Sequence, residues 1–406
     1  MSDASDMTFS VIVVSRGRPE WLARCLMGLR QLDHPEFEII VVADSVSLQR
    51  VDCAGMKTVP FDTPNISAAR NAGIGVAAGE ICAFVDDDAV PEPLWLSHHE
   101  AALRETVADA SVGFVRGRNG ISYQSRLAFV DNEAETHQAD IKGIDPVVPI
   151  PPDGQAVKLV GTNMAIRRSV LFALGGFDPA LRFFLDDTDV SLRLAKAGYK
   201  VAVAALAEVH HGFAPSERRT ALRAPVDLFD IGRSSAIYFR RHGAVDMAEL
   251  WARIERRERA RLLRHMVQGT CEPRDVARVL KTLKAGWEDG FAAELPTLNV
   301  VDSQTEFARY QPLRPGAHQI VATRLLRRRQ GIRIAEGLAR GGQRASVFSF
   351  SLTPVRHHVR YTAGGVWLQT GGQFGRTCRN GPLFKWCRFA SRQKEETDRV
   401  AKIRGI

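Results

Sequence analysis

The sequence predicts an α/β fold with a mixed central sheet flanked by helices, followed by a smaller C-terminal α/β module. Short β-branched runs alternate with helix-periodic segments through residues 9–206, which is the pattern of strands joined by helices. The apolar runs at 9–14, 37–42 and 81–85 each stop beside a polar or acidic residue, and ligands of open α/β sheets bind at such strand ends. A second strand–helix–strand pattern begins near residue 318 and predicts the smaller module.

Composition limits the function classes. The 406-residue chain has room for two or three domains. Its hydrophobic content of 45% and charged content of 25% are those of a soluble globular protein. A formal charge of +9 predicts an anionic partner such as a nucleotide or a membrane surface. Nucleic acid would match this charge too, but the chain carries no recognised nucleic-acid-binding motif, so we expect no nucleic acid partner.

Cysteine usage and the N-terminus bear on the compartment. The six cysteines form no close CxxC pair, which argues against a zinc site and a disulfide framework. This usage predicts a reducing, cytoplasmic environment. Residues 1–6 are polar and acidic, and no apolar run reaches the ~18 residues that indicate a membrane span. We therefore expect neither a signal peptide nor a spanning helix, and only peripheral contact with the inner face of the membrane.

The chain opens with a predicted strand–helix–strand unit. Residues 9–14 have the composition of a buried parallel strand, and residues 21–32 carry apolar side chains at helical spacing. The second strand, 37–42, leads to Asp44. A small-residue helix ending near residue 78 follows, and its alanines would let it lie close against the sheet.

Three aspartates follow the strand at 81–85. Because strand side chains alternate, we expect Asp86 and Asp88 on one side and Asp87 on the other. Two carboxylates on one side repel each other unless a cation lies between them. A hard divalent ion that bridges to a phosphate-bearing substrate suits oxygen ligands. The alternative is a solvated acidic turn, with Asp88 capping a helix begun near Pro91.

The middle of the chain continues the α/β pattern around a long loop. The sequence predicts a helix at 95–103, a strand at 111–118 and a helix at 168–174. Residues 131–154 are polar and rich in proline, and loops of this length in compact domains are usually lids or binding elements.

A second acidic group opens the helix predicted at 190–197. Capping and the helix dipole explain Thr188 and Asp189, but they do not require both Asp186 and Asp187. The next strand leads to His210 and His211, which are potential metal ligands. A lone histidine there would usually be structural. Two acidic groups and a strand-end histidine in one domain favour a metal site.

Together these residues resemble a family 2 glycosyltransferase of the GT-A fold over about residues 8–242. Each motif is short, but the motifs occur in the family's order. They are the 9–14 strand with Ser15 and Arg18, Asp44, Ser67-Ala68-Ala69-Arg70-Asn71-Ala72-Gly73, Gly79-Glu80, Asp86-Asp87-Asp88, Gly161-Thr162-Asn163, Gly176-Phe177-Asp178, Asp186-Asp187-Thr188-Asp189 and His210-His211.

The resemblance implies a donor site for a nucleotide sugar, with a UDP-sugar as the first choice. Asp44 would contact the base and ribose, with the loop from Ser15 to Arg18 nearby. Arg70 would approach the diphosphate. The other residues that the resemblance places in the donor site are Asn71, Asp86, Asp87 and Asn163.

The resemblance also implies a metal site. Asp86 and Asp88 match the outer positions of the DxD motif that holds Mg²⁺ or Mn²⁺. One of His210 and His211 would complete the site, and the sequence does not decide which.

The implied chemistry is transfer with inversion. Asp187 matches the catalytic base of inverting members, and Asp186 stands where the family has a glutamate that helps to position the acceptor. The acceptor hydroxyl loses a proton as it attacks, and a single base opposite the leaving group gives inversion. The acceptor would be a saccharide or a lipid-linked saccharide, and the pathway cell-surface polysaccharide synthesis.

Two other functions stay open. A non-catalytic nucleotide- or saccharide-binding protein can share the fold. A sugar nucleotidyltransferase also pairs a nucleotide with metal-bound carboxylates. Such enzymes usually carry a Gly-rich phosphate loop after the first strand, which residues 15–19 match poorly.

The predicted organisation is a catalytic domain at 1–245, a helical basic region at 246–300 and an accessory module at 301–406. The arginine-rich helix at 250–266 is expected to be a solvated Arg/Glu helix, with contact to anionic lipid as the alternative. The last module resembles the opening of the amino-terminal domain of a family 4, GT-B glycosyltransferase. Arg327-Arg328-Arg329 stands where a Gly-rich loop would be expected, so we predict a non-catalytic module.

Overall fold

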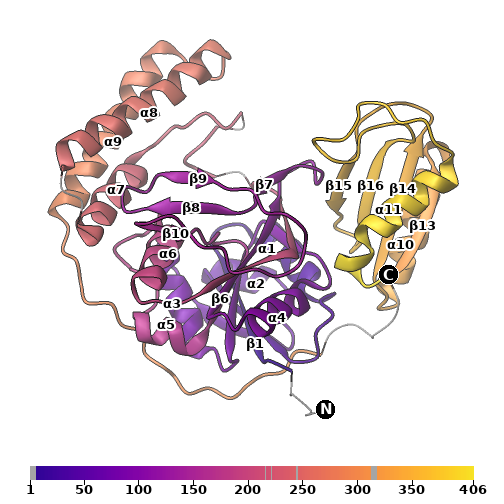
Figure 1. Ribbon diagram of the computed structural model, residues 1–406, viewed down its shortest axis with the longest axis horizontal. Coiled ribbons are helices and arrows are strands. Elements are labelled where there is room, and N and C mark those ends of the chain that lie inside the picture. The colour runs from indigo at the N-terminus through magenta and orange to yellow at the C-terminus, as the bar shows by residue number, and fades with distance from the viewer. Residues whose placement is uncertain (1–5, 215, 221, 244–245, 312–317) are drawn as a thin grey trace.

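The computed structural model describes residues 6–214, 216–220, 222–243, 246–311 and 318–406. Within them it confirms the predicted mixed α/β fold (Figure 1). The described part of the chain has a nine-stranded central sheet in the order β3-β2-β1-β4-β11-β6-β12-β5, with β7 paired to β6. The strands are β1 (Phe9–Ser15), β2 (Phe37–Ala43), β3 (Lys57–Pro60), β4 (Ile81–Asp86), β5 (Ala89–Pro91), β6 (Ala110–Arg116), β7 (Tyr123–Ser125), β11 (Met164–Arg167) and β12 (Val201–His211). Strands β3, β2, β1 and β4 are parallel, and β11 runs antiparallel to both of its neighbours.

Helices cover both faces of this sheet. They are α1 (Pro19–Leu29), α2 (Ser45–Arg50), α3 (Ile66–Val76), α4 (Trp95–Thr106), α5 (Arg168–Leu174) and α6 (Asp186–Lys196). Alternation along β1 divides the core: Phe9, Val11 and Val13 pack with α1 and α4, whereas Ile12 packs with α3, α5 and α6. This period of two is what a strand covered on both faces requires.

Small residues bring α3 close to the sheet, as the alanine-rich segment predicted. A Cβ at Gly73 would lie 2.6 Å from Ile12 Cγ2, so a larger residue would push the helix away. Asn65 fixes the start of the helix, because its side chain accepts a hydrogen bond from the Ala68 N–H at 3.0 Å. This close approach holds Arg70 against the end of β4.

The long loop predicted at 131–154 is partly ordered into strands, which differs from the expectation. Strands β8 (Ala128–Asp131) and β9 (Thr136–Gln138) form a hairpin, and β10 (Gln155–Val157) pairs with the other edge of β8. The Asp131 carboxylate closes the turn by accepting hydrogen bonds from the N–H groups at residues 133 and 135. Strands of three or four residues leave little periodic signal in a sequence.

A helical lobe follows the sheet domain. It consists of α7 (Phe229–His242), α8 (Met247–Val267) and α9 (Pro273–Ala292). Helices α7 and α9 touch through glycines: a Cβ at Gly286 would lie 1.9 Å from the Phe229 carbonyl oxygen, and one at Gly290 would lie 2.3 Å from that of Arg233.

Helix α8 is the predicted basic helix, and acidic residues neutralise much of its charge. Within α8, Arg259 pairs with Glu255 at 2.7 Å and Arg261 with Glu258 at 3.1 Å. Arg253 reaches out of the helix to Glu133. This arrangement is the one expected of a solvated Arg/Glu helix. None of the helices in the described residues is both long and apolar enough to cross a membrane.

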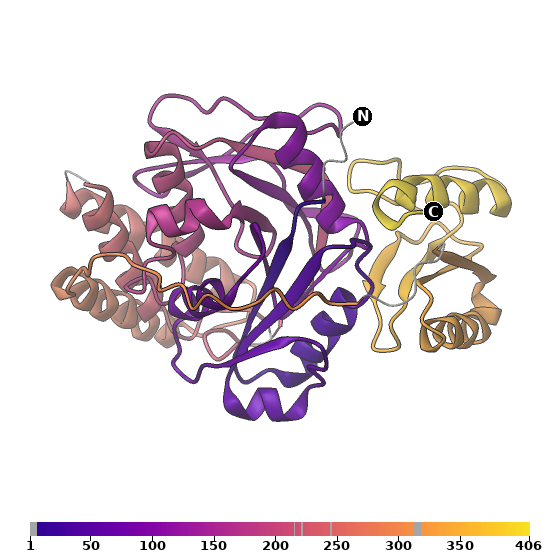
Figure 2. The ribbon, with the colours of Figure 1, turned by 90° about the horizontal axis from the view of Figure 1, so that it is seen from below.

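Residues 293–311 form an extended segment that runs along the sheet domain toward the C-terminal module (Figure 2). The segment is held by the backbone: the Ser303 N–H donates to the Gly75 carbonyl at 2.8 Å and the Tyr310 N–H to that of Phe37 at 2.7 Å. The carboxylate of Glu38, a buried residue of β2, accepts a hydrogen bond from the Ala308 N–H at 2.9 Å.

The C-terminal α/β module is present, as predicted. Its elements are β13 (Gln319–Arg324), the 3₁₀ turn η1 (Leu325–Arg327), α10 (Arg328–Arg340), β14 (Ala345–Ser351), β15 (His358–Tyr361), β16 (Trp367–Gly372) and α11 (Phe389–Arg404). The module packs against the sheet domain through an apolar cluster that includes Val90, Val359 and Trp367. The Arg404 guanidinium donates to both oxygens of the buried Glu92 carboxylate at 2.8 Å.

Candidate active site

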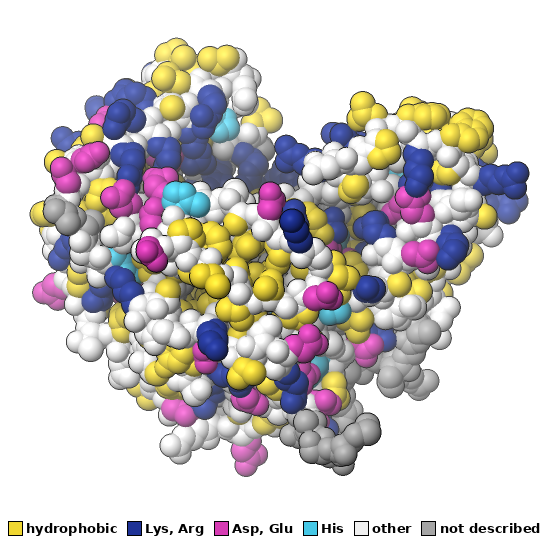
Figure 3. All heavy atoms as spheres, viewed as in Figure 1, with side chains coloured by type: hydrophobic (Ala, Val, Ile, Leu, Met, Phe, Trp, Pro, Cys, Tyr) yellow, Lys and Arg dark blue, Asp and Glu magenta, His cyan; other side chains and the backbone are white. Residues whose placement is uncertain are grey.

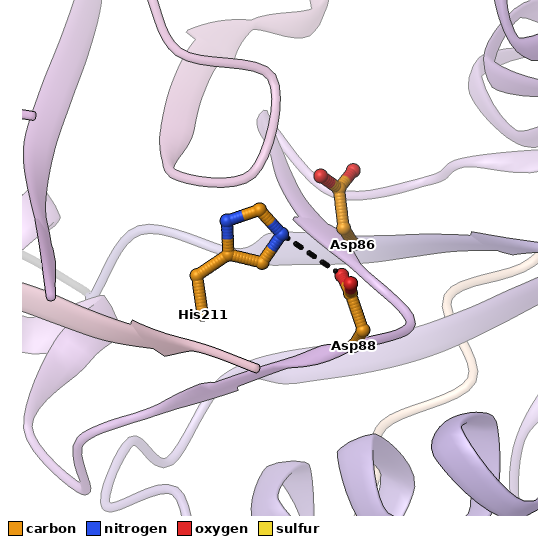
Figure 4. Close-up of side chains that lie close together, drawn as sticks. All are labelled: Asp86, Asp88 and His211. Atoms are coloured by element: carbon orange, nitrogen blue, oxygen red, sulfur yellow. Dashed lines mark ion pairs between the residues drawn. The ribbon is translucent and has the colours of Figure 1, made fainter. Parts of the chain in front are cut away.

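Three strand ends bring Asp86, Asp88 and His211 together (Figure 4). Asp86 ends β4, Asp88 lies in the turn before β5, and the pairing of His211 with Ala89 places the end of β12 beside that turn. One ligand-capable atom from each of the three residues lies within 4.8 Å of the others, and His211 Nε2 lies 3.1 Å from Asp88 Oδ1. Two carboxylates and an imidazole are a donor set for a divalent cation.

Hydrogen bonds and neighbouring charges shift the pKa values of the three residues in this cluster. Burial alone would raise the pKa of Asp88, but the His211 imidazole, the Ala214 N–H at 2.7 Å and Arg18 outweigh it and hold that pKa at about 2. Burial lowers the pKa of His211, but the neighbouring Asp88 carboxylate has the larger combined effect and raises it. Burial also raises the pKa of Asp86 against the opposing charge of Arg70.

Asp87 has other partners, as its place between the two ligands predicted. The Ser15 hydroxyl donates to Asp87 Oδ2 at 2.6 Å, and Arg18 Nη2 lies 2.7 Å from Asp87 Oδ1. Burial raises the pKa of Asp87 to about 7 despite these partners. Ser15 thus contacts Asp87, and Asp87 in turn contacts Arg18, which lines the cavity beside the cluster.

Arg70 joins the two acidic groups of the sequence. Its guanidinium is buried, contacts Asp186, lies 3.4 Å from Asp86 Oδ1 and donates to the Gly161 carbonyl at 3.1 Å. Burial raises the pKa of Asp186 to about 6, with Arg70 acting in the opposite direction. The predicted contact of Arg70 with a diphosphate stays a prediction, because here its guanidinium is directed at protein acceptors.

Asp187 lies in the first turn of α6, beside this group. Its Oδ2 accepts a hydrogen bond from the Gly161 N–H at 3.0 Å, and its Oδ1 accepts one from the Thr188 hydroxyl at 3.2 Å. Asp186 is bound by Arg70, so the two acids of the pair have different surroundings. Gly161 contacts both Arg70 and Asp187, which places the second acidic group next to the first.

Asn163, which the resemblance places in the donor site, is fully buried in this structure. Its amide nitrogen donates to the Phe114 and Ala207 carbonyls, at 2.9 and 2.7 Å. Its amide oxygen accepts a hydrogen bond from Trp95 Nε1 at 2.8 Å. With its amide satisfied by the core, Asn163 serves packing in this structure and does not reach the cavity.

Asn71 and Asp44 also have structural partners. The Asn71 side chain donates to the Phe177 carbonyl and accepts from the Phe177 N–H, at 2.7 and 2.8 Å. Asp44 is the N-cap of α2 through Ser47 and also accepts a hydrogen bond from the Gly17 N–H at 2.7 Å. Asp44 thereby fixes the Gly17 loop, and its predicted contact with a nucleotide stays a prediction.

His210, the alternative to His211 in the sequence analysis, lies outside the cluster of Asp86, Asp88 and His211. Its Nε2 lies 2.9 Å from Glu92 Oε1, and its ring lies 4.7 Å from that of Trp367 in the C-terminal module. Successive side chains of a strand point to opposite sides, so β12 presents only one of the two histidines to the cluster.

A cavity of about 390 Å³ adjoins the cluster. Beyond the acidic residues, its wall is rich in arginine: Arg18, Arg118, Arg218, Arg219, Arg223 and Arg261. Burial and then neighbouring arginines lower the pKa of Arg219 and Arg223. The sequence reasoning missed this wall. Its signal was the run of basic residues soon after His211, at 218–223.

The arrangement combines a cation site with an anion-binding wall in one cavity. Asp86, Asp88 and His211 supply ligands for a divalent ion, and the arginines supply charge for phosphate oxygens. Such a site is suited to metal-assisted chemistry on a phosphate-bearing ligand.

Comparison with known proteins finds glycosyltransferases among the proteins that this chain is similar to. Residues 10–171 match the family model described as "Glycosyl transferase family 2". The chain is similar to "Probable glycosyltransferase YdaM" of Bacillus subtilis, with 25% identity over 213 residues that cover 47% of each chain. It is also similar to "Pre-mycofactocin glycosyltransferase" of Mycobacterium tuberculosis, with 26% identity over 234 residues that cover 55% of this chain and 45% of the relative. The chain thus spans about half the length of the curated relatives it matches.

Among solved structures, the chain is similar to the mannosyltransferase PcManGT from Pyrobaculum calidifontis in complex with GDP-Man and Mn²⁺. That likeness has a TM-score of 0.43 at 15% identity, and it covers 71% of this chain and 88% of the other.

Proposed function

We propose that this chain is a metal-dependent glycosyltransferase that takes a sugar from a nucleotide-diphosphate donor. The observation that carries the proposal is the cluster of Asp86, Asp88 and His211 at the ends of β4 and β12, beside an arginine-lined cavity. The match of residues 10–171 to a glycosyltransferase family supports it independently. A UDP-sugar remains the first choice of donor.

The donor atoms fit Mg²⁺ or Mn²⁺. Two carboxylates and one imidazole nitrogen converge, and the Asp88 carboxylate is held ionised by its hydrogen bonds. A divalent ion bound there would offset the negative charge that develops on the leaving diphosphate. Arg219 and Arg223 would bind the diphosphate oxygens from the opposite wall.

We propose that Asp187 is the general base and that transfer inverts the anomeric centre. Asp187 and Asp186 lie together at the start of α6, but Asp186 is bound by Arg70, whereas the Asp187 carboxylate accepts hydrogen bonds from the Gly161 N–H and the Thr188 hydroxyl among the described residues. A carboxylate with spare acceptor capacity can take the proton of an attacking hydroxyl. Arg70 and Gly161 would position the pair relative to the metal ligands.

The acceptor would be a saccharide or a lipid-linked saccharide, in cell-surface polysaccharide synthesis in the cytoplasm. The family resemblance in motif order supports this class, and the arginine wall would suit an acceptor that carries phosphate. The C-terminal module would be a non-catalytic accessory, since the residues that line the cavity all precede residue 262. Its likeness to the opening of a GT-B domain remains part of this proposal.

The test uses the full chain with Mn²⁺, a panel of UDP- and GDP-sugars and saccharide acceptors. Wild-type protein should bind one donor and release nucleoside diphosphate. Asp187→Asn should abolish transfer and leave donor binding nearly intact, whereas Asp88→Asn should lose metal-dependent donor binding. Equal loss of binding and transfer in Asp187→Asn would refute its role as the base.

Product analysis separates the alternatives. A sugar nucleotidyltransferase would release pyrophosphate in place of nucleoside diphosphate. A non-catalytic binding protein would bind the donor and release neither product. With an inverting enzyme, an α-linked donor should give a β-linked product, and retention would overturn that part of the proposal.

A further inference from the structure

We infer that the outer tip of the C-terminal module docks on an anionic lipid membrane. This inference goes beyond the proposed reaction and does not depend on it. The apolar tip consists of Leu352, Val355, Phe374, Leu383, Phe384 and Trp386. Apolar side chains gather on this part of the molecule in the space-filling view (Figure 3).

The tip is exposed to an unusual degree for large apolar residues. Trp386 is 78% exposed, Leu383 71% and Leu352 69%, with Val355 and Phe384 above half. Single exposed apolar residues need no explanation, but contiguous patches of them mark interaction sites.

Hydrogen bonds and ring stacking hold the tip in one shape. The rings of Phe374 and Trp386 stack at 4.9 Å with an interplanar angle of 3°, and Phe384 lies 5.6 Å from Phe374. The Phe374 N–H donates to the Thr353 carbonyl, and the Phe374 carbonyl accepts from the Lys385 N–H at 2.9 Å. The two loops that carry the tip are therefore joined at Phe374.

The charge of the surrounding chain favours an anionic surface. Residues 337–394 contain ten lysines and arginines and no aspartate or glutamate. Among the described residues, Arg356, Arg376, Arg379 and Arg388 beside the tip have no carboxylate within 4.0 Å. Basic residues next to inserted apolar side chains bind membranes that carry negative lipid.

The mixture of side chains favours lipid over nucleic acid. Single-stranded nucleic acid is bound by aromatic rings that stack on the bases. The aliphatic side chains of Leu352, Val355 and Leu383 cannot stack in this way. Tryptophan at the headgroup level with aliphatic residues below it is the pattern of membrane interfaces. Helix α8, the basic helix of the sequence analysis, is a weaker candidate because four of its arginines pair with glutamates, namely Arg253, Arg257, Arg259 and Arg261.

The experiment is sedimentation of the full chain with vesicles of phosphatidylcholine, with and without phosphatidylglycerol. We expect binding only where phosphatidylglycerol is present. The combined variant Leu383→Ser, Phe384→Ser and Trp386→Ser should bind at least tenfold more weakly, and so should Arg376→Ser with Arg379→Ser and Arg388→Ser. Unchanged thermal unfolding would show that these exposed substitutions leave the fold intact.

Two matched controls test whether the tip itself is responsible. Val267→Ser removes an apolar residue that is 83% exposed on the other lobe, and Arg274→Ser with Lys281→Ser and Lys284→Ser removes three basic residues from exposed positions of α9. Both should bind vesicles like the wild type. Equal loss in the α9 variant would show unspecific attraction and overturn the inference.

Tryptophan emission supplies a direct readout. Phosphatidylglycerol vesicles should shift the wild-type emission to shorter wavelength, and Trp386→Phe should abolish that shift while it keeps most of the binding. Binding to phosphatidylcholine alone, or no vesicle binding at all, would overturn the inference. In the second case, retention of RNA on a filter would identify nucleic acid as the partner, and concentration-dependent sedimentation velocity would identify a second copy of the chain.

Discussion

His210 and His211 are consecutive residues of β12 whose imidazoles serve two different sites. His211 Nε2 lies 3.1 Å from Asp88 Oδ1 in the candidate metal cluster. His210 Nε2 lies 2.9 Å from Glu92 Oε1, which also binds Arg404 of the C-terminal module. A single strand end thus contributes both to the cavity and to the interface with the module.

Because the two histidines contact different groups, replacing each with alanine should have different effects on ligand binding and stability. His211→Ala should weaken Mn²⁺-dependent binding of nucleoside diphosphate by at least tenfold, because it removes a ligand. His210→Ala should leave that binding within about twofold and lower thermal stability, because it removes a partner of buried Glu92. Isothermal titration with UDP and Mn²⁺, beside thermal unfolding of both variants, measures the difference. Equal weakening of UDP binding would contradict the assignment.

The Glu92 interface should be sensitive to acid. Burial would raise the pKa of Glu92, but Arg404 and His210 outweigh it and hold the pKa below its ordinary value of 4.5. A carboxyl whose pKa is lower when folded stabilises the protein fully above the unfolded pKa, and the contribution is lost as pH falls below it. The stabilisation should therefore be complete above about pH 5 and decline below about pH 4.5.

Thermal unfolding between about pH 6 and about pH 4 tests this, with Glu92→Gln as the comparison. The variant should be less stable at the higher pH by ~3–5 kcal/mol, since it leaves Arg404 buried with a weaker partner. The difference between the two proteins should shrink toward the acid end. A difference that stays constant with pH would show that Glu92 is not the group responsible.

Sequence reasoning singled out Asp86, Asp88 and His211 because these residues lie at strand ends, and the structure brings the three together. Strand ends can be read from apolar runs, and parallel strands bring their carboxyl ends to one edge. Position within a motif does not reveal which way a side chain turns. Asn163 follows the same loop as Gly161, yet it turns into the core, where Trp95 and two carbonyls satisfy it.

The arginine wall and the domain interface depended on contacts between distant parts of the chain. Arg118 and Arg261 lie 143 positions apart in the sequence and line one cavity. Glu92 pairs with Arg404, which lies 312 positions later in the sequence. Contacts of this kind depend on how helices and strands pack against each other. The local hydrophobic periodicity of the sequence does not predict them.

Arg70 should stabilise the folded protein, because its guanidinium contacts two carboxylates beside the cavity. Replacing it with Met leaves Asp86 and Asp186 without their shared cation, which should cost ~3–5 kcal/mol of stability. Adding Asp186→Asn should restore part of that loss, because one of the two unpaired charges is removed. Urea unfolding of the single and double variants measures the coupling. A double variant that is less stable than Arg70→Met would contradict the electrostatic explanation.

Arg219 and Arg223 should destabilise the free protein and strengthen anion binding. Neither has a carboxylate within 4.0 Å among the described residues, and burial with neighbouring arginines lowers the pKa of both. Positive charges held together without a counterion repel each other, and a bound diphosphate relieves that repulsion. Arg219→Gln with Arg223→Gln should therefore raise or preserve the melting temperature while it weakens UDP binding about tenfold, or ~1.4 kcal/mol.

Arg218→Gln is the matched control, because Arg218 already pairs with Asp230, at 2.5 Å, and its loss should lower stability slightly. The double variant should also reduce the salt dependence of UDP binding, since fewer charges face the ligand. A lower melting temperature with unchanged UDP affinity would show that the two arginines support the fold and not the ligand.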